Sequence, residues 1–161
     1  PFFRDLWGNP SSMHSFGGQV ARHVEKAREQ VAALLGAQRP SGGWCRNLGG
    51  HPDCTLHAVR AFGAHPGLRG SVYAVRALTF LRSTRSEWAG GVRLYAALDA
   101  AAAFDLPEAH ELLHDMLAAA APHQRRDGTF GTPHRVGRVA AVVAAMRAVD
   151  TSSTAPPFSL N

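Results

Sequence analysis

Two histidines four residues apart form the pattern with the sharpest chemistry in this sequence. His110, Glu111 and His114 read H-E-x-x-H inside a stretch that predicts a helix. On a helix, this spacing places both imidazoles on one face, where they can bind Zn²⁺ while the glutamate acts as general base on a metal-bound water. A zinc site needs a third ligand, and no glutamate follows Glu111. The three hypotheses are therefore a zinc-dependent hydrolase, a casual metal site without catalysis and the polar face of an ordinary amphipathic helix.

A second group of metal-ligating residue types lies earlier in the chain: Cys45, His51, Asp53, Cys54 and His57. Thiolate and imidazole suit zinc, although the spacing of the two cysteines is not that of a zinc finger. The structural alternative makes Cys54 a small buried apolar residue and Asp53 a helix cap. Two cysteines do not make a disulfide framework and fit a reducing compartment, so we expect a cytoplasmic protein.

Helices must position these residues. Apolar residues at helical spacing, bounded by Gly, Pro and Ser, predict helices over 15–36, 53–63, 69–83, 90–104, 107–121 and 135–149, and no convincing strand. Ser15 is the expected N-cap of the first helix and Gly36 its end. Asp105 and Glu108 predict a capping box around Pro107. Asp99 is a lone acid in an apolar helix, a weak candidate for acid catalysis.

Composition narrows the function classes. The 161 residues are 45% hydrophobic and 18% charged, which indicates a globular chain. The net charge of +5 comes almost entirely from scattered arginines, with no aromatic-interleaved basic patch, so we expect no nucleic-acid partner and attribute the charge to coding bias. No stretch approaches the ~18 apolar residues of a membrane helix, and we expect no membrane span.

The first 37 residues carry a resemblance to a known family. The matching residues occur in this order: Pro1-Phe2-Phe3, then Gly8-Asn9-Pro10-Ser11-Ser12 with His14 and Gly17, then Ala27-Arg28-Glu29-Gln30-Val31-Ala32, and finally Leu34-Leu35-Gly36-Ala37. This segment resembles the N-terminal part of NifS-like cysteine desulfurases, pyridoxal-phosphate (PLP) enzymes of the class V aminotransferase group. The resemblance implies that Asn9, Ser11, Ser12 and His14 form a loop near a substrate pocket.

The resemblance stops after Ala37. The family's phosphate-binding loop, Schiff-base lysine and mobile catalytic cysteine do not follow, and Lys26 is the sole lysine of the chain. A PLP enzyme needs an amine to hold the cofactor aldehyde. We therefore expect no cofactor in this chain alone, and PLP only if the desulfurase core is supplied elsewhere.

A weak internal repeat runs through the remainder. Trp44, Trp88 and Phe130 each lie in a predicted turn with glycine beside or soon after them, ahead of an apolar helix, at spacings of 44 and 42 residues. Such periods are typical of helical repeats. The stretch 124–131 resembles the Gln-x-x-x-Gly-x-aromatic turn of terpenoid cyclases and protein prenyltransferases, which are α/α toroids. That family's zinc ligands imply a similar role for Asp53 and Cys54, but these two are adjacent rather than spaced.

Together these patterns predict an all-α chain. It comprises an N-terminal loop and amphipathic helix (1–37), a junction (38–50), a helical-repeat module forming a partial toroid-like arc (51–150) and a loose tail (151–161). The first functional hypothesis is an incomplete or fused chain, not catalytic alone, whose module binds an apolar small molecule or protein at exposed helix edges or pairs with its own copy. The second is part of a cysteine desulfurase, an enzyme of sulfur mobilisation for Fe–S cluster assembly, whose catalytic core lies outside this chain. The third is the zinc hydrolase.

Overall fold

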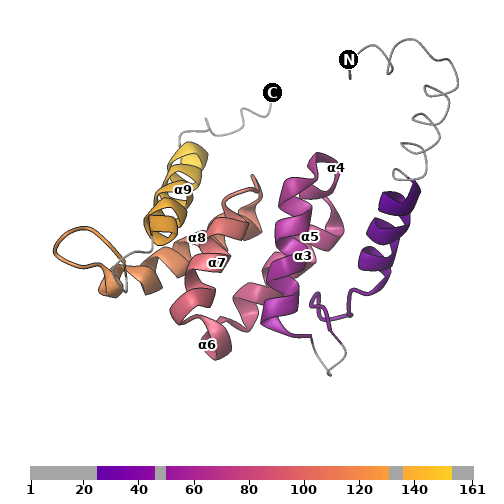
Figure 1. The fold of residues 1–161 in the computed structure, drawn as a ribbon, viewed down its shortest axis with the longest axis horizontal. Helices are drawn as coiled ribbons and strands as arrows, with labels where there is room; N and C mark the ends of the chain where they lie inside the picture. Colours follow the sequence, from indigo (N-terminus) through magenta and orange to yellow (C-terminus); the bar gives the residue numbers. More distant parts are fainter. Residues whose placement is uncertain (1–24, 46–49, 131–135, 154–161) are drawn as a thin grey trace, which may run out of the picture. The chain divides into compact units, whose positions relative to one another are not determined.

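The computed structural model describes residues 25–45, 50–130 and 136–153 (Figure 1). The chain divides into two compact units, residues 1–37 and residues 38–161. The candidate loop Asn9, Ser11, Ser12 and His14, the predicted cap Ser15 and the tail beyond 153 lie outside the described residues.

In the first unit, residues 25–36 form a helix, which is the described part of the helix predicted over 15–36. Glu25 and Arg28 pair across one turn, with 3.7 Å between the carboxylate and the guanidinium. Val31 and Leu34, from the predicted apolar stripe, are half-buried, whereas Lys26 is exposed. The helix ends where Ala37 N–H donates to the Ala33 carbonyl at 3.1 Å.

The second unit is built from helices. They are α3 (Pro52–Ala64), α4 (Pro66–Arg69), α5 (Val72–Ser83), α6 (Arg85–Trp88), α7 (Gly91–Ala101), α8 (Pro107–Ala120), the 3₁₀ turn η1 (Ala121–His123) and α9 (Val136–Ser153). The described residues hold no strand, only two isolated antiparallel bridges. The predicted all-α class is confirmed, and the toroid-like arc stays a prediction.

The hydrophobic core of this unit is centred on α7 and α8. Helix α3 packs on α5 and α7, α5 packs on α8, and α9 packs on both α7 and α8. The largest fully buried side chains come from α3, α5, α7 and α8 and include Phe62, Leu78, Leu81, Leu94, Leu98, Leu112, Leu113 and Met116. This burial is the main force that holds the helices together.

Helices α3, α4 and α8 begin at a proline, and the beginnings of α3 and α8 correct the predicted caps. Pro disfavours helical geometry in the residue before it, so His51 and Leu106 are extended and become the N-caps of α3 and α8. Asp53 therefore lies inside the first turn of α3, and its N–H donates to Nδ1 of His51 at 3.3 Å. The predicted capping box at Asp105 does not form, because the helix starts one residue too late for it.

Candidate functional site

Two aromatic turns in the second unit share one backbone conformation. In the first, Arg39 N–H donates to the Gly43 carbonyl and Gly42 N–H to the Arg39 carbonyl, both at 2.9 Å. In the second, Arg125 N–H donates to the Thr129 carbonyl at 2.8 Å and Gly128 N–H to the Arg125 carbonyl at 2.9 Å. The two turns have the same spacing, Gln38 to Trp44 and Gln124 to Phe130. The repeat predicted from the sequence is thus a repeat of structure at two of its three positions.

Each turn buries its aromatic side chain against another ring. Trp44 meets Phe62 edge-on, with 5.4 Å between ring centroids, and Phe130 meets Tyr95 in the same way at 6.2 Å. The guanidinium of Arg138 lies 4.9 Å from the centre of the Tyr95 ring, in cation–π contact. The third predicted turn differs: Trp88 closes the short helix α6, and its indole N–H donates to the Leu81 carbonyl at 3.2 Å and to Thr84 Oγ1 at 3.1 Å.

The carboxylate of Asp127 closes the second turn. It accepts from the hydroxyl of Thr129 at 2.7 Å and from the Thr129 N–H at 3.0 Å. These hydrogen bonds favour the charged form and lower the pKa of Asp127. Because the folded-state pKa is depressed, the carboxylate supports the turn above its unfolded-state pKa, and this support is lost as pH falls through the folded-state pKa.

We predict that Thr129→Ala returns the Asp127 pKa toward the ordinary aspartate value. The alanine removes the hydroxyl donor, which is the larger cause of the shift, and leaves the backbone donor in place. A carbon-detected NMR titration of the Asp127 side chain measures this directly. An Asp127 pKa that is the same in both proteins would show that the hydroxyl does not hold the carboxylate.

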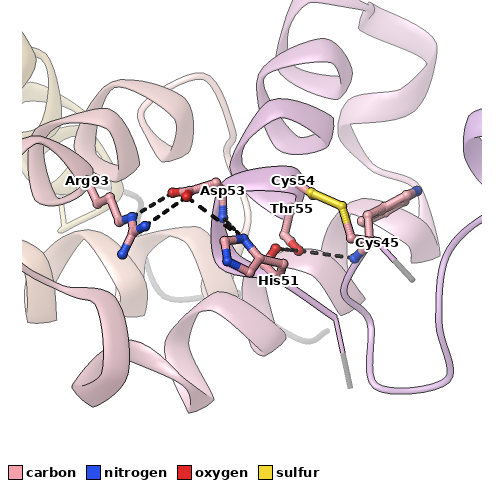
Figure 2. Close-up of polar contacts among 7 residues, drawn as sticks. Cys45, His51, Asp53, Cys54, Thr55 and Arg93 are labelled. Atoms are coloured by element: carbon pink, nitrogen blue, oxygen red, sulfur yellow. Dashed lines mark hydrogen bonds and ion pairs between the residues drawn. A yellow bond between two sulfur atoms is a disulfide. The ribbon is translucent and has the colours of Figure 1, made fainter. Parts of the chain in front are cut away.

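The first aromatic turn is joined to α3 by a disulfide between Cys45 and Cys54, whose Cα atoms lie 6.1 Å apart (Figure 2). This corrects the sequence-based expectation of two unpaired cysteines. The reason is local: Trp44 and His51 form an antiparallel bridge, with His51 N–H donating to the Trp44 carbonyl at 2.8 Å. The bridge brings the residue after Trp44 beside the first turn of α3. The Cα separation lies within the usual range for disulfides.

The remaining members of this cluster do not gather around a metal. Asp53 points to Arg93 of α7, which donates from Nε at 2.7 Å and from its terminal nitrogen at 2.8 Å (Figure 2). His51 caps the helix, and His57 is exposed on its outer face. A disulfide sulfur is no longer a thiolate ligand. Among the described residues, no three His, Cys, Asp or Glu side chains form a group that could hold a metal ion.

The Asp53 pair links α3 to α7 at the surface, and we predict a small energetic role for it. Both side chains are nearly half exposed, so water screens the pair. Arg93→Ala should lower the free energy of unfolding by ~1 kcal/mol or less, even though the pair is bidentate. Urea unfolding of the variant checks this. A loss several times larger would mean that Arg93 also carries packing between the two helices.

Glu111 and His110 of the H-E-x-x-H pattern contact charged neighbours. Glu111 forms an ion pair with Arg82 of α5, and Arg82 also contacts Asp115 at 3.2 Å. His110 lies 3.6 Å from the carboxylate of Asp105, and His114 is exposed. The carboxylate of Glu111 is therefore directed to Arg82 of the neighbouring helix.

A cavity of about 400 Å³ lies beside this helix, but it does not include the two histidines. It is lined by Ser83, Arg85, Ser86, Ala89, Asp115, Met116 and Ala119. Arg85 and Asp115 face each other across 3.5 Å, so the two charged groups of the cavity are paired with each other. The other acid singled out from the sequence, Asp99, is paired with Arg60 at 3.1 Å on the surface.

Large apolar side chains are exposed at a few places in the second unit. They are Val72, Val92, Val143 and Met146, and the last two share one face of α9. The predicted apolar ligand, protein partner and self-association stay predictions. No helix among the described residues is long and apolar enough to cross a membrane.

Comparison with known proteins finds cysteine desulfurases. The chain is 68% identical over 37 residues to the cysteine desulfurase of Nostoc sp. (strain PCC 7120), which is 23% of this chain and 9% of that protein. It is 46% identical over 63 residues to the cysteine desulfurase NifS of Azotobacter vinelandii, which is 38% of this chain and 16% of that protein. The chain thus spans only a small part of the curated relatives it matches. No family model and no solved structure matches it.

These comparisons confirm the desulfurase resemblance as a partial match. They give no support to the resemblance to terpenoid cyclases and prenyltransferases. The sequence did not show that Cys45 and Cys54 bond to each other, nor that Gln38 and Gly42 belong to the first aromatic turn. The turn could be found from the spacing of Gln38, Gly42 and Trp44, which equals that of Gln124, Gly128 and Phe130. The disulfide leaves no such signal, because the second turn has no cysteine.

Proposed function

We propose that residues 1–37 are the N-terminal segment of a PLP-dependent cysteine desulfurase whose catalytic core lies outside this chain. The observation that carries the proposal is the 68% identity over 37 residues to the Nostoc enzyme. Identity of this degree in a segment that contains the residues Gly8-Asn9-Pro10-Ser11-Ser12 is far above what shared composition produces. The described helix 25–36 agrees with the helix that the sequence predicts in this segment.

The residues of this chain do not fit PLP by themselves. The cofactor is held through an amine and needs an acid on its ring nitrogen, both within a pocket that excludes water. Lys26 is the sole lysine, and it is exposed on the helix 25–36, beside Glu25 on the same polar surface. No step of a PLP reaction is therefore assigned to this chain, and the segment contributes to the proposed enzyme by packing and by its loop.

A chimera tests the proposal. The matching 37 residues of the Nostoc enzyme are replaced by residues 1–37 of this chain, and sulfide released from cysteine is measured. We expect the chimera to bind PLP and to retain most of the parent activity. The matched control inserts residues 52–88 of this chain, an equally long helical segment, and should be inactive.

The result that would overturn the proposal is a folded, PLP-loaded chimera that is as inactive as the control. The intact chain gives a second readout. The purified chain, without added PLP, should show no absorbance of a bound PLP imine. Cofactor retained at Lys26 through purification would contradict the assignment of Lys26 to an exposed surface.

A further inference from the structure

One cysteine of the Cys45–Cys54 disulfide is exposed and has an uncommon backbone conformation. Cys45 is exposed and adopts φ of 88°, the left-handed region that residues other than glycine seldom occupy. Among the described residues it is the sole non-glycine with positive φ. Its partner Cys54 is half-buried and is the third residue of α3. Strained and exposed disulfides are the ones that exchange readily with thiols.

The first aromatic turn does not depend on the disulfide for its attachment to α3. Trp44 N–H donates to Oγ1 of Thr55 at 3.1 Å, and that hydroxyl donates to the His51 carbonyl at 2.9 Å. Thr55 is fully buried, so these hydrogen bonds are shielded from water. On the other side of the turn, Nε2 of Gln38 donates to the carbonyls of Gly42 and Tyr73, both at 2.9 Å. Opening the sulfur–sulfur bond therefore leaves the turn in place.

The charges around the pair distinguish its two sulfurs. A thiolate at Cys54 lies in the first turn of α3, where the helix dipole stabilises negative charge. The neighbouring negative charge, on Asp53, is held by Arg93 and so opposes that thiolate little. Nε of Arg39 donates to the Cys45 carbonyl at 3.2 Å, which places a cation beside the backbone of Cys45.

We propose that this disulfide is a thiol-exchange site for small anionic thiols, with Cys45 as the attacked sulfur and Cys54 as the leaving group. In the first step a thiolate attacks Sγ of Cys45, a new bond forms between those two sulfurs, and the electron pair of the broken bond goes to Cys54. In the second step another molecule of the thiol attacks the small-molecule sulfur of the mixed disulfide, and the electron pair of the broken bond goes to Cys45. The two small molecules leave as a disulfide, and their two protons go to Cys45 and Cys54, which become thiols. The proposal does not rest on the desulfurase function.

Reduced glutathione is the probe. The oxidised chain is exposed briefly to it under native conditions and alkylated with N-ethylmaleimide, and its peptides are mapped by mass spectrometry. We expect glutathione on Cys45 and the maleimide on Cys54, at a rate that low urea does not increase. Glutathione on Cys54, or opening of the disulfide only after the chain unfolds, would overturn the proposal.

Two variants test the role of charge. In Cys45→Ser, the rate at which Cys54 is alkylated should reach half its maximum at a pH below ~8.5, the pKa of an ordinary thiol. In Arg93→Ala, the released carboxylate of Asp53 should slow exchange about twofold to fivefold. The matched control is Arg60→Ala, which breaks another surface pair made by α3, with Asp99, and should not change the rate. Two results would contradict the assignment of Cys54 as leaving group. One is a Cys54 alkylation rate with the pH dependence of an ordinary thiol, and the other is equal exchange rates in the two arginine variants.

Discussion

Replacing Gly42 with alanine should lower the free energy of unfolding by ~3 kcal/mol or more. Gly42 has φ of +96°, which strains any residue with a Cβ, at a cost of ~1–2 kcal/mol. A Cβ there would also lie 2.2 Å from the carbonyl oxygen of Arg76. Because that oxygen belongs to the backbone of α5, it cannot move aside as a flexible side chain could. The turn must instead separate from α5, and urea unfolding of the variant measures the loss.

Gly128→Ala is the matched control for that prediction. Gly128 occupies the same position of the second aromatic turn, with φ of +79°, but a Cβ there meets nothing within 4 Å. We therefore expect a loss of only ~1 kcal/mol, from backbone strain alone. The difference between the two variants isolates the close approach of the first turn to α5. Equal losses would mean that this approach is looser than the 2.2 Å contact indicates.

The helices of the second unit could be predicted because their ends are marked locally. Proline opens α3 and α8, Ser71 caps α5 through a hydrogen bond from Ala74 N–H, and Gly90 precedes α7. Such signals act within a few residues, so a sequence pattern captures them. The predicted N-caps Asp53 and Asp105 are wrong, and His51 and Leu106 are the N-caps instead. The effect of proline on the residue before it outweighs the preference for an acidic N-cap.

Contacts between distant residues could not be predicted in the same way. Arg93 reaches Asp53 and Arg82 reaches Asp115 across separate helices, and neither pair leaves a periodic signal in the sequence. The hypothesis of a metal cluster at Cys45 and Cys54 fails for this reason. The sequence shows which residue types are near each other along the chain, whereas the bridge between Trp44 and His51 decides that the two sulfurs bond to each other.

Phe62→Ala should produce the second large effect, a loss of ~3–5 kcal/mol in the free energy of unfolding. Phe62 has no exposed surface, and its ring supports Trp44 from within α3 while that helix packs on both α5 and α7. Truncation removes the buried ring and leaves a cavity that three helices cannot close by small movements. Val72→Ala, at a position that is 62% exposed, should change stability by less than ~0.5 kcal/mol and serves as control. If Phe62→Ala cost no more than that control, the first aromatic turn could not be packed on α3, and its hydrogen bonds to Thr55 would have to hold it alone.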